Sequence, residues 1–305
     1  MSKRSPTAAR SPRGRPVRAA VRVPAVLVLL ATTGCSVTST LAATTPSRGA
    51  IVRDIAYGEG PRRRLDVYTP AVGGSAPVIV FIYGGSWQNG DRSIYRFVGK
   101  ALAARGFVTV IPDYRVYPEV RYPDFLRDNA QAVRWARDHA AAYGGDGSRL
   151  FLVGHSAGAY DVAMLNLDRR WLNGVGMDPA RDVRAAVALA GPYDFLPLHD
   201  RTLMTIFGPE AARPLTQPIA YADGRAPPMF LGAPVRDTVV DPQNANRLAA
   251  KIRAQGGQAE VKFYPRISHQ LAIGAFAAPL RFLAPTLDDT VDFLRRHDRR
   301  PQPPT

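Results

Sequence analysis

The sequence predicts an α/β fold, with a mostly parallel sheet that carries helices on both faces. Three short segments, at residues 77–83, 107–111 and 150–153, are almost continuously apolar and are each followed by Pro or Gly. Runs of this length and composition indicate strands that are buried on both faces. Segments with helical spacing of apolar residues follow the first two runs, at residues 93–105 and 125–143. Alternation of such strands with helices is typical of a parallel sheet.

The other elements continue this alternation along one domain, which we place at residues 51–298. Residues 62–68 alternate between polar and apolar side chains and predict a strand near the start of the domain. A helix is expected from Ala157 onwards, directly after the run at residues 150–153. Further strands are predicted at residues 183–190, 228–231 and 260–264, and further helices at residues 243–254 and 287–296.

The composition excludes several classes of protein. With 305 residues, 46% of them hydrophobic and 21% charged, the chain has the makeup of a globular protein with a sizeable core. The formal net charge is +15, but seven of the basic residues precede Val23, in a segment without any acidic residue. Without these seven the net charge is roughly halved, and part of the rest lies in Arg295, Arg296, Arg299 and Arg300. The charge therefore indicates a targeting segment and a solvated tail, and we expect no nucleic-acid partner.

Residues 1–34 have the order of a bacterial signal peptide, with a basic segment, an apolar core at residues 23–30 and then small residues. The core is shorter than the ~20 residues that span a bilayer. Gly34-Cys35 resembles a lipobox, which implies that Cys35 is lipidated and becomes the mature N-terminus. Cleavage near residues 40–42 is the alternative. We therefore predict an exported protein: a cell-envelope lipoprotein anchored to the membrane through Cys35 or, without the lipid, a periplasmic or secreted protein.

Two short regions flank the predicted domain. Residues 35–50 are rich in Ser, Thr and Ala and predict a linker. Residues 299–305 predict a basic, proline-rich tail. Cys35 is the only cysteine, so an intrachain disulfide is excluded.

The segment Gly-His-Ser-Ala-Gly at residues 154–158 predicts a nucleophilic serine. It stands directly between a buried strand and a helix, the setting in which a sharp turn raises a serine hydroxyl above the sheet. Glycine at Gly154 and Gly158 removes the Cβ atoms that would clash in such a turn. We therefore assign the nucleophile to Ser156. We expect His155 to pack or hydrogen-bond within the turn rather than to react.

A serine nucleophile needs a base, and three histidines follow Ser156 in the chain. His297 belongs to a polar terminal helix, where a solvated histidine is expected. His199 precedes the last strands, and in this arrangement the acid comes before the histidine. His269 follows the strand at residues 260–264, in a loop where a base should lie, and we select it.

The acid should follow the strand at residues 228–231, which leaves Asp237 and Asp241. Asp241 precedes Pro242 and a helix, and aspartate before proline is a common N-terminal cap, so Asp241 has a structural explanation. We choose Asp237 and keep Asp241 as the alternative. For the oxyanion we expect the backbone amides of Gly84 and Gly85, which follow a buried strand, together with the amide of Ala157.

These motifs resemble the α/β-hydrolase fold, and more narrowly the carboxylesterase/lipase branch related to hormone-sensitive lipase, which includes arylformamidases and feruloyl-esterase-like enzymes. The resemblance extends from about Arg62 to Phe293. It is carried by the segments at residues 83–87, 113–115, 143–146, 154–158 and 191–194 and by Asp237 and His269. The chain departs from the family at Tyr83, where the oxyanion loop His-Gly-Gly-x-Trp has histidine, and at Pro234, where relatives tend to carry glycine. The resemblance implies an eight-stranded sheet with a small cap or none.

The resulting prediction is a serine carboxylesterase that hydrolyses small to medium acyl esters through an acyl-enzyme. An amidase or arylformamidase of the same mechanism is the first alternative, and a non-catalytic binding protein with a hydrolase fold is the second. No spacing of His, Asp or Glu suggests a metal site, so we expect no metal or other cofactor. The sequence leaves the oligomeric state open.

Overall fold

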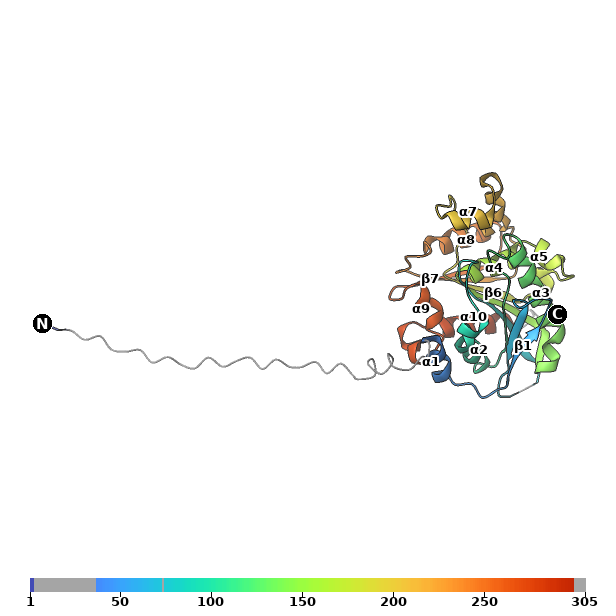
Figure 1. The fold of residues 1–305 in the computed structure, drawn as a ribbon, viewed down its shortest axis with the longest axis horizontal. Helices are drawn as coiled ribbons and strands as arrows, with labels where there is room; N and C mark the ends of the chain where they lie inside the picture. Colours follow the sequence, from blue (N-terminus) through green and yellow to red (C-terminus); the bar gives the residue numbers. More distant parts are fainter. Residues whose placement is uncertain (3–36, 73, 299–305) are drawn as a thin grey trace. The chain divides into compact units, whose positions relative to one another are not determined.

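The computed structural model describes residues 1–2, 37–72 and 74–298 (Figure 1). Nearly all of the predicted signal peptide, Cys35 and the predicted tail at residues 299–305 therefore lie outside the described residues. Within the described residues, no helix combines the length and the apolar character needed to cross a bilayer.

The central element is an eight-stranded sheet with the strand order β1-β2-β4-β3-β5-β6-β7-β8. The first two strands along the chain form the antiparallel end of the sheet, and all strands from β4 to β8 pair in parallel. This arrangement confirms the predicted mostly parallel sheet. The strands are β1 (Ile51–Ala56), β2 (Arg64–Tyr68), β3 (Ala76–Ile82), β4 (Val108–Pro112), β5 (Gly145–His155), β6 (Ala185–Leu189), β7 (Met229–Pro234) and β8 (Ala259–Tyr264).

Helices cover both faces of the sheet. In Figure 1, α4 and α8 lie above the strands and α2 and α10 lie below them. The α-helices are α1 (Val37–Thr44), α2 (Arg96–Ala103), α3 (Asp124–His139), α4 (Ala157–Leu167), α5 (Arg170–Asn173), α6 (Pro179–Asp182), α7 (Arg201–Phe207), α8 (Gln243–Ala254), α9 (His269–Gly274) and α10 (Thr286–Asp298). Short 3-10 helices are η3 (Arg92–Tyr95), η4 (Ala140–Tyr143), η5 (Glu210–Thr216), η6 (Pro218–Tyr221) and η7 (Ala278–Leu283).

The register of the sheet brings the loops that follow its parallel strands to one edge. Ile82 at the end of β3 pairs with Gly154 in β5, and His155 pairs with Leu189 at the end of β6. Leu189 in turn pairs with Gly232 in β7. Loops at the carboxyl ends of neighbouring parallel strands form the usual ligand-binding edge of an α/β sheet. The segments after β3, β5, β7 and β8 therefore converge there.

The structure differs from the sequence prediction at the start of the domain. The predicted linker at residues 35–50 is wrong where α1 forms and packs on the domain. Thr45, at the end of this helix, is fully buried, and its hydroxyl donates to the carbonyl of Leu41 and accepts from the amide of Ala278. Lys100 Nζ donates to the carbonyl of Ala42 over 2.6 Å. These tertiary contacts stabilise a segment whose own apolar pattern is weak.

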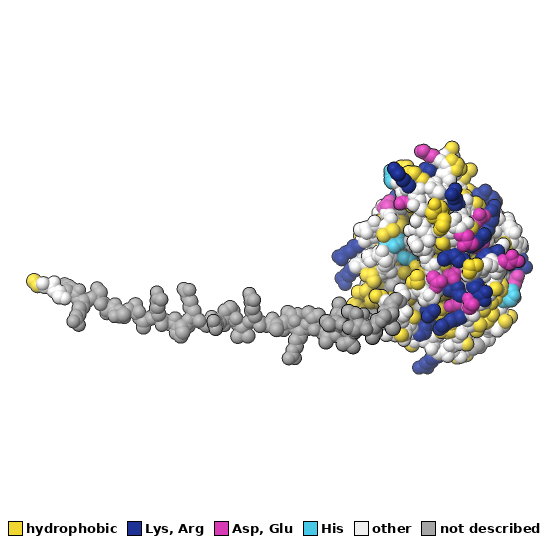
Figure 2. All heavy atoms as spheres, in the orientation of Figure 1, with side chains coloured by type: hydrophobic (Ala, Val, Ile, Leu, Met, Phe, Trp, Pro, Cys, Tyr) yellow, Lys and Arg dark blue, Asp and Glu magenta, His cyan; other side chains and the backbone are white. Residues whose placement is uncertain are grey.

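Residues 190–228, between β6 and β7, form a small cap. This segment contains α7, η5 and η6, and Figure 1 shows α7 at the top of the molecule, beyond the edge of the sheet. On the surface seen in Figure 2, basic and acidic side chains are interspersed over the domain. Several of the arginines pair with aspartates, as Arg170 does with Asp168 and Arg225 with Asp223.

Candidate active site

Ser156 occupies a strained turn between β5 and α4. Its backbone has φ 57° and ψ −123°, a conformation that non-glycine residues seldom adopt. The turn is tight because its flanking glycines lie against other backbone atoms. A Cβ on Gly154 would lie 2.3 Å from the carbonyl oxygen of Gly158, and one on Gly158 would lie 2.1 Å from that of Ile82. The amide of Ser156 donates to the carbonyl of Leu189 over 2.9 Å, which fixes the turn to β6.

Ser156, His269 and Asp237 form one chain of hydrogen bonds. The Oγ of Ser156 lies 2.8 Å from Nε2 of His269, and Nδ1 of His269 lies 2.7 Å from Oδ2 of Asp237. The His269 side chain is 7% exposed and that of Asp237 is 1% exposed, so water has little access to the link between them. Three residues that are distant in the sequence are thus brought together from the ends of β5, β7 and β8.

Asp237 is held as an acceptor by its own loop. Its Oδ1 accepts hydrogen bonds from the amides of Val239 and Val240 at 2.8 and 2.9 Å. Burial alone would raise the pKa of Asp237, but the hydrogen bonds from the imidazole and the two amides outweigh it and lower the pKa. The group is therefore a carboxylate at neutral pH, with Oδ2 accepting from His269.

The other candidates considered in the sequence lie outside this chain of hydrogen bonds. Asp241 Oδ1 accepts from the amide of Gln243 at the start of α8, and its Oδ2 pairs with Arg247 at 2.9 Å. The ring of His297, in α10, packs on that of Phe293 at 4.6 Å. His199 lies on the cap and lines the pocket described below. The hydrogen bond from the Gln243 amide gives Asp241 the structural role at the start of α8 that the sequence predicts.

His155 contacts the backbone of His269. Its Nε2 lies 3.0 Å from the carbonyl oxygen of His269, and its ring is 5% exposed. Burial, together with repulsion from His269, lowers the pKa of His155 to about 3. The ring is therefore neutral at ordinary pH, and Nε2–H donates to the carbonyl. This contact joins the turn that carries the nucleophile to the first residue of α9.

The glycine-rich loop after β3 approaches the nucleophile closely. A Cβ on Gly84 would lie 2.7 Å from the Cβ of Ser156, so no larger residue fits there. The next three residues, Gly85, Ser86 and Trp87, have φ values of 139°, 54° and 56°. Ser86 lines the pocket together with Ser156 and Ala157. The sequence does not single out Ser86, because residue type alone does not show which loop residue faces a pocket.

Tyr83 holds the start of this loop, directly after β3. Its hydroxyl donates to Oδ1 of Asp113 over 2.8 Å, and its carbonyl accepts from the hydroxyl of Tyr114 over 2.8 Å. The Tyr83 ring also stacks on those of Tyr95 and Tyr114, with centroids 5.3 and 4.9 Å apart. Asp113 pairs in addition with Arg92. The residue that replaces the histidine of the family pattern therefore has a structural role in holding the loop.

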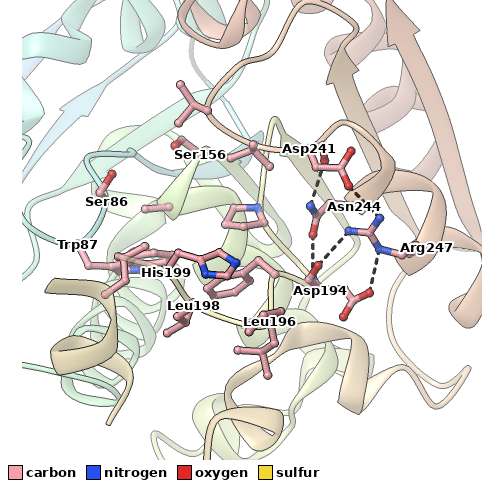
Figure 3. Close-up of a pocket in the computed structure, with 17 residues that line it drawn as sticks. Ser86, Trp87, Ser156, Asp194, Leu196, Leu198, His199, Asp241, Asn244 and Arg247 are labelled. Carbon is pink, nitrogen blue, oxygen red and sulfur yellow. Dashed lines mark hydrogen bonds and ion pairs between the residues drawn. The ribbon is translucent and has the colours of Figure 1, made fainter. Parts of the chain in front are cut away.

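A pocket of about 450 Å³ opens beside Ser156 (Figure 3). This volume lies within the range of small-molecule sites, roughly 300–1,000 Å³. Most of its wall is apolar, from Trp87, Phe195, Leu196, Leu198, Leu203, Val239 and Val240. Figure 3 shows a charged cluster of Asp194, Asp241 and Arg247, with Asn244, at the end away from Trp87. Arg247 pairs with Asp194 at 2.8 Å and with Asp241 at 2.9 Å.

Comparison with known proteins identifies similar chains. The chain is 30% identical to an isoprenylcysteine alpha-carbonyl methylesterase, ICME, of Arabidopsis thaliana, over 71% of this chain and 56% of that protein. It is 31% identical to esterase LipC of Mycobacterium tuberculosis, over 66% of this chain and 55% of that protein. The chain thus spans about half the length of the curated relatives it matches.

Solved structures share the fold. Esterase 2 of Thermogutta terrifontis has a TM-score of 0.66 and 24% identity, covering 85% of this chain and 98% of that one. A truncated carbohydrate esterase from gut microbiota has a TM-score of 0.72 and 20% identity, covering 83% of this chain and 97% of that one. These similarities confirm the α/β-hydrolase fold predicted from the motifs.

The match to a family covers most of the domain. The sequence model of the BD-FAE family matches residues 65–252, from β2 into α8. This range includes the loop after β3, the nucleophile turn and the loop of Asp237. It agrees with the resemblance to esterases of the α/β-hydrolase type. The chain belongs to the BD-FAE family.

Proposed function

We propose that the chain is a serine carboxylesterase that hydrolyses small to medium acyl esters through an acyl-enzyme. The observation that carries this proposal is the chain of hydrogen bonds from Ser156 through His269 to Asp237, at the mouth of a largely apolar pocket. Relatives named as esterases support the reaction class. Small-molecule esters are the substrates that this site would take.

In the first step, Nε2 of His269 accepts the proton of Ser156 as Oγ attacks the ester carbonyl carbon. The carboxylate of Asp237 holds the imidazole by its Nδ1–H and stabilises the positive charge that develops on the ring. The imidazolium then gives its proton to the leaving alcohol as the C–O bond breaks. A water molecule, deprotonated by His269, attacks the acyl-enzyme, and the proton returns to Ser156 as the acid leaves.

The tetrahedral intermediate needs hydrogen-bond donors for its oxyanion. We assign these to the backbone amides of Ala157, at the start of α4, and of Gly85 and Ser86 in the loop after β3. The sequence also suggests Gly84 as a donor, and the absence of a Cβ there lets the loop approach Ser156 closely. A preorganised donor of this kind is worth roughly 10²–10³ in kcat.

The pocket supports a preference for short acyl or alcohol groups. Its volume of about 450 Å³ is enough for a small ester but leaves little room for a long chain. The small cap at residues 190–228 supplies Phe195, Leu196, Leu198 and Leu203 to the wall, which favours apolar substituents. Esters of acids up to medium length therefore fit the site best.

The test compares the purified full chain with its Ser156→Ala variant on p-nitrophenyl acetate, butyrate and octanoate. We expect hydrolysis by the wild type that falls by 10³-fold or more in the variant, since removal of such a nucleophile has an effect on that order. Equal, negligible rates in two folded proteins would contradict the proposal. The matching p-nitroanilides serve as a control for amidase activity, and faster hydrolysis of anilides would assign an amidase instead.

We further propose that the protein is exported and lipidated at Cys35, which lies outside the described residues. Support comes from α1, which begins at Val37, two residues later. Cleavage near residues 40–42 would cut this helix and remove the Leu41 and Ala42 carbonyls that Thr45 and Lys100 contact. Metabolic labelling with an alkyne fatty acid in a bacterial host should mark the wild type and spare Cys35→Ser. A mature N-terminus at residues 41–43 would contradict lipidation.

A further inference from the structure

The loop that carries the proposed oxyanion donors is strained, and its strain must be held in place. Gly85, Ser86 and Trp87 are three consecutive residues with positive φ, of which only the first is glycine. A left-handed backbone at a bulky residue such as Trp87 is unfavourable and persists only where neighbouring contacts fix it. The residues that make those contacts therefore influence where the amides point.

Two hydrogen bonds fix Trp87. Its carbonyl accepts from the amide of Tyr117 over 2.8 Å. Its indole Nε1–H donates to Oδ1 of Asp161 over 3.0 Å. The ring also contacts an aromatic cluster of Phe125, Tyr160, Phe195 and Phe207, with centroid distances of 4.8–6.3 Å. Ring contacts alone would let the indole shift within the cluster, whereas the hydrogen bond to Asp161 fixes the orientation of the indole.

Asp161 lies in α4, the helix that starts directly after Ser156, and is 0% exposed. Its other oxygen, Oδ2, accepts from Nδ2 of Asn129 in α3 over 3.0 Å. Both of these partners are uncharged. The buried carboxyl group has therefore lost its hydration, and neither partner supplies a positive charge in its place. Burial raises the pKa of Asp161, and the bond from Trp87 lowers it only in part. Such a group is costly to bury, and the proposed reaction makes no direct use of it.

We propose that Asp161 is a positioning residue for the reaction: through Trp87 it fastens the oxyanion loop to the helix of the nucleophile. The bond links the two sources of oxyanion donors, the loop after β3 and the N-terminus of α4. The inference rests on the proposed function. It implies that loss of the bond weakens stabilisation of the transition state while leaving binding of the substrate ground state nearly unchanged.

The test uses kcat and KM on p-nitrophenyl acetate, together with the affinity for a boronic acid, which forms a tetrahedral adduct with a serine. Asp161→Leu removes the acceptor with little change in size, and Trp87→Phe removes the donor while keeping an aromatic ring. We expect each to lower kcat about 10²-fold, as loss of one oxyanion donor does, with KM within about threefold. Boronate affinity should fall in parallel.

Two further variants sharpen the result. Asp161→Asn keeps an oxygen for Trp87, and its new amide can donate to Oδ1 of Asn129, which has no partner among the described residues. This variant should retain kcat within about threefold. In the double variant that combines Trp87→Phe with Asp161→Leu, kcat should be no lower than in the less active of the two single variants. Both substitutions break the same hydrogen bond.

Asn166→Leu is the matched control, because Asn166 is also fully buried in α4 and donates to the carbonyl of Pro227 over 3.0 Å. It should lower the free energy of unfolding and leave kcat unchanged. If Asp161→Leu fails to fold, Trp87→Phe and Asp161→Asn decide the question. Wild-type kcat in Trp87→Phe, or an equal loss of kcat in Asn166→Leu, would overturn the inference. A wild type without esterase activity would instead overturn the proposed function.

Discussion

The surroundings of Ser156 and the charged end of the pocket are built differently. Beside Ser156, the side chains of His269 and Asp237 are 7% and 1% exposed, and Gly84 is packed so closely on Ser156 that no Cβ fits. At the charged end, Arg247 and its two aspartates are 38–53% exposed and are joined by ion pairs. Buried, backbone-bound groups keep one geometry, whereas exposed ion pairs contribute about 0–1 kcal/mol each. The geometry around Ser156 is therefore held more firmly than that of the ion pairs at the charged end.

The largest contrast is expected between the two aspartates that the sequence left as candidates. Asp237→Asn should lower kcat by about 10⁴-fold, because an amide favours the wrong tautomer of the catalytic histidine. Asp241→Asn removes an exposed charge at the start of α8 and should leave kcat within about threefold. Steady-state rates on p-nitrophenyl acetate measure both. A greater loss in Asp241→Asn would reverse the assignment of the acid.

The close packing of the loop on the nucleophile predicts a second large effect. Gly84→Ala should lower kcat about 10²-fold, since its methyl group would displace Ser156 or the loop by a substantial part of an ångström. Gly274→Ala, in α9, is the control, because a Cβ there meets its nearest atom at 3.5 Å. It should preserve kcat. Full activity in Gly84→Ala would show that the loop tolerates displacement.

The buried His155 predicts a pH dependence of stability. Its pKa in the folded state, about 3, lies below the ordinary value of 6.5, so the unfolded state binds more protons between these values. Stability from this group is complete above pH 6.5 and is lost as pH falls toward 3, by about 1.4 kcal/mol for each pH unit. His155→Gln should flatten the profile by about that slope in urea unfolding from pH 6 to pH 4. Parallel profiles would contradict a neutral buried ring.

The smallest effect is expected at the charged end. Arg247→Ala breaks two half-exposed ion pairs and should change kcat/KM for p-nitrophenyl acetate by less than about fivefold. Changes should be larger for esters with polar alcohols that reach this end. A series of alcohol groups on one acyl chain measures the difference. A loss of 100-fold on the acetate would place Arg247 in the reaction itself and end the contrast between the two regions.

The same contrast separates what the sequence could predict from what it could not. The apolar runs of β3 and β5 and the helix α8 are recognisable from local pattern, and so is the nucleophile turn. β1 was missed because Arg53 and Asp54 interrupt its apolar residues and because most of this edge strand is exposed. α1 was missed because its stability depends on Thr45 and Lys100, contacts that only the folded chain reveals.

Within the candidate site, residue type was informative only where the chemistry demands it. A glycine-flanked serine, a histidine after the last strand and a choice between two aspartates can be derived from order along the chain. Ser86 lines the pocket, and Asp161 accepts one 3.0 Å hydrogen bond from Trp87 across the fold. Neither feature leaves a periodic or compositional signal, so both required the tertiary structure.

Covalent trapping of the serine shows whether His269 and Asp237 make Ser156 reactive. The full chain would be treated with a fluorophosphonate, and the modified peptide would be mapped by mass spectrometry. We predict a single adduct on Ser156 in the wild type and none in His269→Ala or after heat denaturation. An adduct on another residue, or equal labelling of Ser156 in folded His269→Ala, would contradict the account.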